Sequence, residues 1–476
     1  MDYRNLVGGQ WLETTDSTPN VNPSDISDIL GYAAKAGVDQ LDQAIDAAHQ
    51  AAPGWAASTP QQRFDVLDFV GTELLARKAE LGRLLSREEG KTLPEGIGEV
   101  ARAGQIFKFF AGEALRLAGD RLASVRPGIE VDVTRFPIGV VGLITPWNFP
   151  IAIPAWKIAP ALCYGNAVIL KPAELVPGCA HALIEILSRS GLPEGVVNLV
   201  MGRGSQIGPR LVESAKVKAI SFTGSVPTGR GIAAACGQHL KKVQLEMGGK
   251  NPMVVLDDAD LAIAVEASLN GAFFSTGQRC TASSRLVVTE GIHDRFVEAL
   301  AERMQALKVG NALEDGVQMG PVVDERQLQQ NLSYVDIAAK EGGKVQGGER
   351  LNRDTEGFYM APALVSETDN AMRINTEEVF GPVASVIRVK DYEEALAVAN
   401  DTEFGLSAGI CTTSLKHASH FKANAEAGMV MVNLPTAGVD YHVPFGGTKG
   451  SSFGSREQGR YAAEFYTSVK TAYTLP

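Results

Sequence analysis

The sequence predicts an α/β protein built from two doubly wound domains, with a small extra element of exposed strands. Three observations predict this: the chain has 476 residues, short apolar runs alternate with helical stretches, and the alternation begins again after about residue 250. A chain of this length exceeds one core of ordinary domain size. Strands that alternate with helices form parallel sheets, because each connection needs a long crossover.

The first domain is expected to begin with helices and to continue as a sheet. Residues 38–117 carry apolar residues at the three-and-four spacing of amphipathic helices. Between residues 139 and 247 the apolar runs are short: GVVGLI, NAVILK, VVNLV, VKAISF and KVQLEM. Helical stretches such as CAHALIEILSRSG and SQIGPRLVESA separate these runs. The pattern predicts a parallel sheet with helices on its faces.

A second series of elements follows. NPMVVLDD, SRLVVTEG, VASVIRV and GMVMVNL are predicted strands, and residues 258–274 and 293–307 are predicted helices. Two segments fit neither sheet. Residues 124–137 alternate like an exposed hairpin, and the final stretch AEFYTSVKTAYTLP reads as another strand. Because unpaired strand edges tend to be covered or used for pairing, we expect subunit contacts there.

The net charge and the cysteine spacing indicate which binding partners and which cellular compartment to expect. The net charge of −11 argues against a general nucleic-acid surface, which needs clustered Lys and Arg. Five widely spaced cysteines without a C-x-x-C pair favour a reducing compartment. The N-terminal residues lack the pattern of a signal peptide. We therefore expect a cytoplasmic protein.

One apolar segment approaches the length of a membrane span. Residues 140–162 contain four prolines and Lys157, which fit a lipid-facing helix poorly. The segment is predicted to form a buried strand, a loop and a helix, and no membrane association is expected.

Several strand ends carry residues suited to binding anions or sugars. MGRGSQIG and FTGSVPTG follow predicted strands and open helices, which suits phosphate binding, although neither matches G-x-G-x-x-G and turn glycines explain them equally well. Lys171 and Glu174, in KPAE, follow the strand NAVIL, where ligands bind in doubly wound sheets. Alternatively, Lys171 and Glu174 form a solvated charge pair in a loop.

Two further residues are candidates for catalysis. Glu246 ends a strand beside two glycines, where desolvation raises a carboxyl pKa toward that of a general base; an ordinary strand-end glutamate is the alternative. Cys280 stands among small and hydroxyl residues in STGQRCTASSR, unlike core residues. A cationic neighbour, Arg279, would favour its thiolate. A lone cysteine is otherwise most often a small buried hydrophobe.

Together these stretches resemble the aldehyde dehydrogenase superfamily. The signals are TPWNFP, KPAE, FTGS, LEMGGKNP, GQRC, EEVFGPV and PFGG, in the family's order and near its spacing. The resemblance runs from about residue 22 to the end of the chain. It implies NAD(P)-dependent oxidation of an aldehyde to an acid through a thiohemiacetal and a thioester.

The resemblance also implies residue roles. Cys280 would be the nucleophile, Asn148 would donate to the developing oxyanion, and Glu246 would activate the hydrolytic water. Lys171 and Glu174 would hold the adenosine ribose, Glu378 the nicotinamide ribose. Phe380 would pack near the nicotinamide and Ser225 near the pyrophosphate. The remaining predicted cofactor residues are Thr145, Trp147, Gly204, Gly208 and Gly224. Glu174 favours NAD, because a carboxylate repels the 2′-phosphate of NADP, but NADP stays open. The chemistry needs no metal.

The family fold implies domain boundaries and an assembly. Residues 1–118 and 138–248 would form the cofactor-binding domain and residues 249–446 the catalytic domain. Residues 119–137 and 447–476 would form an oligomerisation element that pairs with a neighbouring subunit. A homodimer or homotetramer is expected.

The substrate is predicted from the residues around Cys280. The guanidinium of Arg279 suits an aldehyde with a carboxylate at its far end; alternatively, Arg279 pairs with a protein carboxylate and shapes the loop. Trp156 and Tyr441 are further pocket candidates. Within the family the chain looks most like the 2,5-dioxovalerate (α-ketoglutarate semialdehyde) dehydrogenases. Trp156 stands where succinate-semialdehyde dehydrogenases typically carry an arginine, which disfavours succinate semialdehyde as the preferred substrate. Succinate semialdehyde and an uncharged aldehyde stay open as alternatives.

Three other classes compete with this prediction. A cysteine-dependent hydrolase would leave Lys171, Glu174 and Glu378 without a purpose. A CoA-acylating dehydrogenase generally lacks the base at Glu246. A non-enzymatic relative would usually lose the nucleophile or its partners, and Cys280 and its partners are all present.

Overall fold

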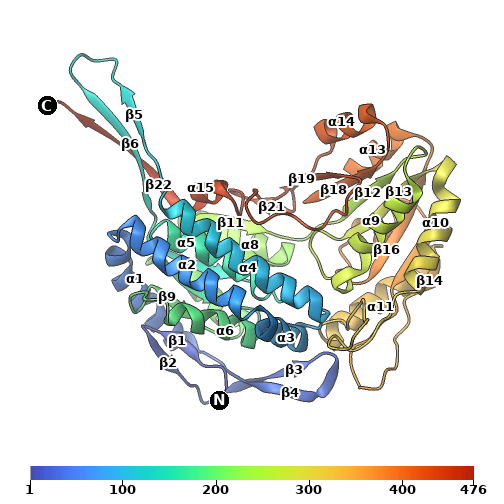
Figure 1. Cartoon of the computed structure of the whole chain (residues 1–476), viewed down its shortest axis with the longest axis horizontal. Helices are drawn as coiled ribbons and strands as arrows, with labels where there is room; N and C mark the ends of the chain where they lie inside the picture. Colours follow the sequence, from blue (N-terminus) through green and yellow to red (C-terminus); the bar gives the residue numbers. More distant parts are fainter. Residues whose placement is uncertain (1) are drawn as a thin grey trace.

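A computed structural model describes residues 2–476. It confirms two doubly wound α/β units and a small strand element (Figure 1). The first sheet has eight strands in the order β2-β1-β9-β8-β7-β10-β11-β21, with a parallel centre and antiparallel edges. Its strands are β1 (Asn5–Val7), β2 (Gln10–Leu12), β7 (Val140–Ile144), β8 (Ala167–Lys171), β9 (Val197–Leu199), β10 (Val217–Thr223), β11 (Lys242–Glu246) and β21 (Ser452–Phe453).

Eight helices belong to the same part of the chain. They are α1 (Val38–Ala56), α2 (Pro60–Ala76), α3 (Lys78–Glu89), α4 (Leu93–Ala114), α5 (Ala152–Cys163), α6 (Pro177–Ser188), α7 (Gly204–Glu213) and α8 (Val226–Gln238). Every residue of α5 is buried, as expected for a helix that is apolar all round. The apolar segment 140–162 is therefore β7, a loop and α5, as predicted. No helix within residues 2–476 combines the length and the apolar character that a bilayer crossing requires.

The second sheet has seven strands in the order β14-β15-β16-β13-β12-β18-β19, all parallel except β14. They are β12 (Asn251–Val255), β13 (Ser283–Thr289), β14 (Lys344–Gly347), β15 (Ala363–Thr368), β16 (Val383–Val389), β18 (Ser407–Cys411) and β19 (Met429–Val432). The longer helices around it are α9 (Leu261–Phe273), α10 (Glu290–Gln305), α11 (Glu325–Lys340), α13 (Tyr392–Asn400) and α14 (Leu415–Asn424). The predicted helices 258–274 and 293–307 correspond to α9 and α10, with ends displaced by a few residues.

The third element is an arm of three strands that projects from the body in Figure 1. It consists of β5 (Asp120–Ala123), β6 (Glu130–Pro137) and β22 (Thr467–Thr474), in the order β22-β6-β5. The predicted hairpin and tail strand thus pair with each other within one chain. The hairpin begins at Asp120, earlier than predicted, because all four β5 residues are exposed and no burial pattern marks them.

The candidate functional residues follow the carboxyl ends of neighbouring strands. Asn148 follows β7, Lys171 ends β8, Gly224 follows β10 and Glu246 ends β11. Carboxyl ends of parallel strands meet at one edge of a sheet, which brings these side chains together. Cys280 lies between α9 and β13 of the second unit and faces this edge.

Candidate active site

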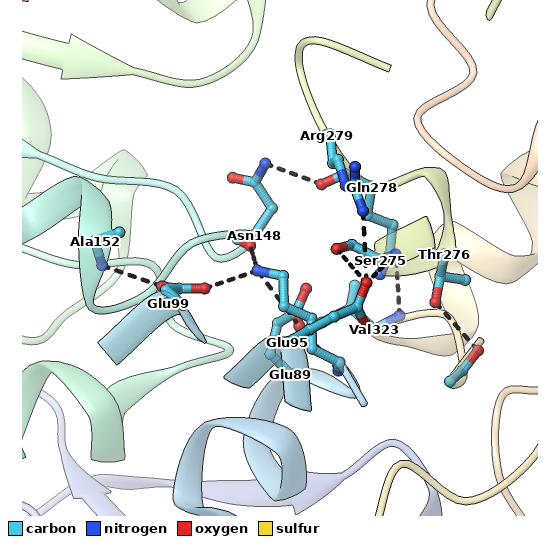
Figure 2. Close-up of polar contacts among 12 residues, drawn as sticks. Glu89, Glu95, Glu99, Asn148, Ala152, Ser275, Thr276, Gln278, Arg279 and Val323 are labelled. Carbon is cyan, nitrogen blue, oxygen red and sulfur yellow. Dashed lines mark hydrogen bonds and ion pairs between the residues drawn. The ribbon is translucent and has the colours of Figure 1, made fainter. Parts of the chain in front are cut away.

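The loop before Cys280 is conformationally strained. Ser275 and Thr276 adopt left-handed φ values of 51° and 55° in the turn Phe274–Gly277. Such values cost energy for residues other than glycine and persist only where the surroundings impose them. Glu95 in the first turn of α4 holds the turn, because one carboxylate oxygen accepts from the Ser275 backbone N–H at 2.8 Å and its hydroxyl at 2.9 Å (Figure 2).

Two cavities meet at Cys280. Cavity A has a volume of about 280 Å³, and cavity B about 240 Å³. Cavity A is lined by Lys91, Glu95, Gly98, Glu99, Arg102, Phe149, Trp156, Ser275, Arg279, Cys280, Thr281, Ala437, Gly438, Val439 and Phe445. Cavity B is lined by Pro146, Trp147, Asn148, Ile153, Thr223, Gly224, Ser225, Met247, Gly248, Cys280, Gln327, Gln330, Glu378 and Phe380. Cys280 borders both, so a molecule in each cavity would lie beside the same residue.

The Asn148 side chain lies beside the nucleophile loop. Its Nδ2 donates to the Gln278 carbonyl oxygen at 3.0 Å, which leaves its second N–H available. Its backbone carbonyl accepts a hydrogen bond from Lys91 Nζ, and Lys91 Nζ also donates to Glu99 at 2.8 Å (Figure 2). Glu99 in turn accepts the backbone N–H groups of Ile151 and Ala152 at the start of α5. This buried network fixes the loop that carries Asn148.

Glu246 is buried at the end of β11 and lines neither cavity A nor cavity B. Its carboxylate is near enough to Cys280 to raise the pKa of the thiol. Its Oε2 accepts from the Ser452 hydroxyl at 2.5 Å. Burial raises the pKa of Glu246 well above its ordinary value, and the nearby Glu457 carboxylate raises it further. Glu457 itself is paired with Lys157.

The Cys280 thiol is held in its neutral form in this structure. Burial raises its pKa to about 12, and the carboxylates of Glu378 and Glu246 raise it further. The expectation that Arg279 would favour the thiolate is wrong here. The Arg279 guanidinium instead points to Glu95 at 3.5 Å (Figure 2). It also donates to the Asn270 side-chain oxygen at 3.4 Å.

Besides Cys280, cavity B gathers six of the predicted residues around a partly aromatic wall. They are Trp147, Asn148, Gly224, Ser225, Glu378 and Phe380. The rings of Trp147 and Phe380 meet edge-to-face with centroids 5.4 Å apart. Glu378 accepts from the Gly249 N–H at 2.9 Å, and a side chain at Gly248 would collide with the Glu378 carboxylate. Burial raises the pKa of Glu378 to about 7.

A second cluster lies past the end of β8. The Gly204 backbone N–H donates to Glu174 Oε1 at 3.1 Å, and a Cβ at Gly204 would lie 3.5 Å from Lys171 Nζ. Lys171 is buried, and burial lowers its pKa. Thr145 joins β7 to this cluster, because its N–H donates to the Lys171 carbonyl at 3.1 Å. Gly208 stands apart within α7, where an added Cβ would meet nothing within 4 Å.

Of the predicted substrate residues, Trp156 and Arg279 line cavity A and Tyr441 does not. The Trp156 ring packs on Phe445 with centroids 5.4 Å apart. Tyr441 packs edge-to-face on Phe109 at 6.4 Å.

Four charged residues of cavity A were missed from the sequence: Lys91, Glu95, Glu99 and Arg102. Three of them recur at helical spacing on α4, at positions 95, 99 and 102. Charges repeated on one face of a helix that also carries apolar residues would have been the signal.

Comparisons with known proteins show the family of the chain. The sequence model of the aldehyde dehydrogenase family matches residues 11–472. An alpha-ketoglutaric semialdehyde dehydrogenase of Bacillus subtilis is 43% identical over 480 residues, covering 100% of this chain and 98% of that protein. An alpha-ketoglutarate semialdehyde dehydrogenase of Haloferax volcanii is 42% identical, covering 99% of this chain and 98% of that protein.

A solved structure gives the same result for the fold. Betaine aldehyde dehydrogenase from Staphylococcus aureus, crystallised in complex with NAD⁺, superposes with a TM-score of 0.97 at 32% identity. The superposition covers 100% of this chain and 95% of that one.

Proposed function

Because this chain belongs to the aldehyde dehydrogenase family, we propose that it oxidises 2,5-dioxovalerate to 2-oxoglutarate with NAD(P). The observation that carries the proposal is the position of Cys280 at the wall shared by cavities A and B. An aldehyde in cavity A and a nicotinamide in cavity B would reach the sulfur from opposite sides. This arrangement suits a two-substrate oxidation better than a hydrolysis.

Cavity B and the cluster at β8 suit a dinucleotide. The edge of the Trp147–Phe380 pair offers a flat apolar surface, and Glu378 offers a carboxylate for ribose hydroxyls. Lys171, Glu174 and the Gly204 N–H offer polar groups for a second ribose. Bound NAD(P) would supply the hydride acceptor. The Glu174 carboxylate favours NAD over NADP through charge repulsion of a 2′-phosphate. The structural neighbour with NAD⁺ bound supports the same choice.

The chain's own groups account for the chemistry at sulfur. The Cys280 thiol loses its proton to water, and the thiolate forms a C–S bond with the aldehyde carbon as the carbonyl π bond breaks, which places negative charge on the former carbonyl oxygen. The free N–H of Asn148 and the Cys280 backbone N–H are the proposed donors to this oxygen. A preorganised donor of this kind contributes about 3 kcal/mol to transition-state stabilisation.

Glu246 is the proposed base for the final hydrolysis. Once oxidation leaves an acyl group on Cys280, a water must lose a proton as it attacks the thioester. A carboxylate with a raised pKa accepts that proton well near neutral pH. The product acid then leaves and the thiol is restored.

The substrate class rests on the relatives and on cavity A. The relatives from Bacillus subtilis and Haloferax volcanii act on an aldehyde that carries a carboxylate, as their names state. Cavity A presents Arg279 and the apolar face of Trp156, and Tyr441 is proposed for its rim. Another small semialdehyde, or an uncharged aldehyde, is the alternative substrate.

We also propose a cytoplasmic homodimer or homotetramer. All five cysteines are free thiols, which supports a reducing compartment. Within residues 2–476 the two outer strand edges of the projecting arm have no partner, which supports pairing with a second copy.

A substrate panel tests the proposal. Initial rates with NAD would be followed at 340 nm for 2,5-dioxovalerate, succinate semialdehyde and pentanal. We expect the highest kcat/KM for 2,5-dioxovalerate, and no turnover in Cys280→Ser at an unchanged melting temperature. Equal kcat/KM for pentanal would reduce the proposal to an aldehyde dehydrogenase of other specificity. Substantial activity of Cys280→Ser would exclude the proposed nucleophile.

A further inference from the structure

Cavity A contains one arginine that has no ion-pair partner in contact. Its charged lining residues are Lys91, Glu95, Glu99, Arg102 and Arg279. Lys91 pairs with Glu99 at 2.8 Å and lies 3.9 Å from Glu89, and Arg279 lies 3.5 Å from Glu95. Among residues 2–476, no carboxylate lies within 4 Å of the Arg102 guanidinium; Glu99, Asp440 and Cys280 act on it only from farther away. A ligand carboxylate would give the Arg102 guanidinium the ion-pair partner that it lacks.

The Arg102 side chain is held in place by neutral groups. Its guanidinium carbon lies 5.8 Å from the centre of the Trp156 ring, and one terminal nitrogen donates to Gln458 Oε1 at 3.2 Å. Its Nε is buried and has no hydrogen-bond partner within residues 2–476. An arginine has five donors in a planar fork. Most of these donors remain available, and an unpaired buried donor costs stability until a ligand satisfies it.

We infer that Arg102, rather than Arg279, is the residue that receives the far carboxylate of the aldehyde substrate. This inference rests on the proposed function and names the group that selects its substrate class. A carboxylate binds the guanidinium fork through two parallel hydrogen bonds. Trp156 and Gln458 fix the fork in advance, so little side-chain freedom is lost on binding.

The same geometry assigns a different part to Arg279. Its charge is already opposed by Glu95, which also holds the strained Ser275 turn. Arg279 therefore helps to position the nucleophile loop. Its loss is expected to affect charged and uncharged aldehydes to the same extent.

Matched variants separate the two arginines. Arg102→Met and Arg279→Met each remove one guanidinium from cavity A and keep a long apolar side chain. We expect Arg102→Met to lower kcat/KM for 2,5-dioxovalerate about 100-fold, mostly through KM, and to change kcat/KM for pentanal less than about threefold. Arg279→Met is expected to lower both values by similar factors. Equal losses on both aldehydes in Arg102→Met, or a charge-selective loss only in Arg279→Met, would overturn the inference.

Arg102→Lys is a second, more conservative variant in case Arg102→Met does not fold. Melting temperatures would show whether each variant is folded. Lysine keeps the charge and loses the fork, so we expect an intermediate loss confined to 2,5-dioxovalerate. A loss shared by pentanal would contradict the inference.

Glutarate provides a readout that needs no turnover. This five-carbon dicarboxylate carries the proposed carboxylate and cannot be oxidised at an aldehyde group. It is expected to slow alkylation of Cys280 by iodoacetamide in the wild type and in Arg279→Met, but not in Arg102→Met. Protection that survives in Arg102→Met, or that is missing in the wild type, would refute the subsite. If the wild type oxidised no aldehyde, the proposed function would fail, and the glutarate result would still decide the role of Arg102.

Discussion

At the scale of single residues, the environment of Cys280 is unusual for a nucleophile. The thiol is half-buried and the groups that act on it most are the carboxylates of Glu378 and Glu246. Its thiolate is therefore scarce near neutral pH in the ligand-free protein.

The raised pKa predicts how the thiol reacts with pH. Below a pKa of about 12, each pH unit raises the thiolate fraction about tenfold, so alkylation of Cys280 should climb through pH 7 to 10 without a plateau. Rates would be measured with iodoacetamide by mass spectrometry of the Cys280 peptide. The unfolded protein is the control and should level off near the ordinary thiol pKa of about 8.5. A plateau near that value in the folded protein would contradict the prediction.

The proposed role of Glu246 as the base for hydrolysis predicts that its replacement slows steady-state turnover but not the first burst of NADH. An amide cannot accept the proton of water, so Glu246→Gln should lower steady-state kcat about 10²- to 10⁴-fold. The first turnover should still produce a burst of NADH, because acylation of Cys280 does not need this base. Stopped-flow absorbance at 340 nm measures both phases. Loss of the burst together with kcat would place Glu246 in the first half of the reaction instead.

The hydrogen bond from Ser452 predicts a pH shift for the same base. Glu246 acts only when ionised, and its pKa is raised, so kcat should rise with pH above the ordinary range of a carboxyl group. The Ser452 hydroxyl stabilises the carboxylate and lowers its pKa. Ser452→Ala should therefore move the acidic limb of kcat to higher pH. An unmoved limb would show that another group controls it.

At the scale of elements, α4 supports the nucleophile from across the domain boundary. Its N-terminal capping box joins Thr92 to Glu95, and the other oxygen of Glu95 holds the Ser275 turn. The helix begins in the first unit and the turn belongs to the second. One carboxylate therefore ties the strained loop to the helix that lines cavity A.

This link predicts the effect of removing Glu95. Glu95→Ala should lower the free energy of unfolding by about 2 kcal/mol, because it removes hydrogen bonds to a charged acceptor. It should also lower kcat about 10- to 100-fold for pentanal and 2,5-dioxovalerate alike, because the nucleophile is misplaced. Glu95→Gln keeps an acceptor oxygen and should be milder. Chemical denaturation and steady-state kinetics measure these effects; a loss with only one aldehyde would contradict the positioning role.

At the scale of the whole molecule, the arm is the part least explained by the single chain. β22 pairs with β6 over its full eight residues, yet the outer edges of β22 and β5 have no partner within residues 2–476. Leu122, Val469 and Tyr473 on these strands are more than half exposed. Such an edge invites pairing with another copy of the chain.

The arm predicts the oligomeric state. Tyr473→Asp should shift the assembly toward smaller species, because it places a charge in the proposed subunit contact. Light scattering coupled to size exclusion measures the mass. Leu415→Asp, on exposed α14, is the matched control and should leave the mass unchanged. Equal masses for wild type and Tyr473→Asp would remove the arm from the interface.

Much of this molecule follows from the sequence alone. The alternation of apolar runs and helices predicts two parallel sheets, because period and turn residues are local properties. Lys171, Gly224 and Glu246 are recognisable because they end or follow strands, and the ends of parallel strands meet at one edge. Asn148 is predicted only through the family resemblance carried by TPWNFP. The domain boundaries and the residue roles stay predictions.

The tertiary structure decided what the local pattern does not contain. Arg102 and Glu95 lie far from Cys280 in the chain and reach it only because α4 packs beside the nucleophile loop. The pKa of Cys280 depends on burial and on carboxylates from distant strands, so the adjacent Arg279 was a misleading guide. Which charged side chains of a cavity pair with each other depends on segments that are far apart in the sequence and meet only in the folded protein. Short-range sequence therefore determined the fold class and predicted the reacting groups, and long-range packing determined which charged side chains lack an ion-pair partner in cavity A.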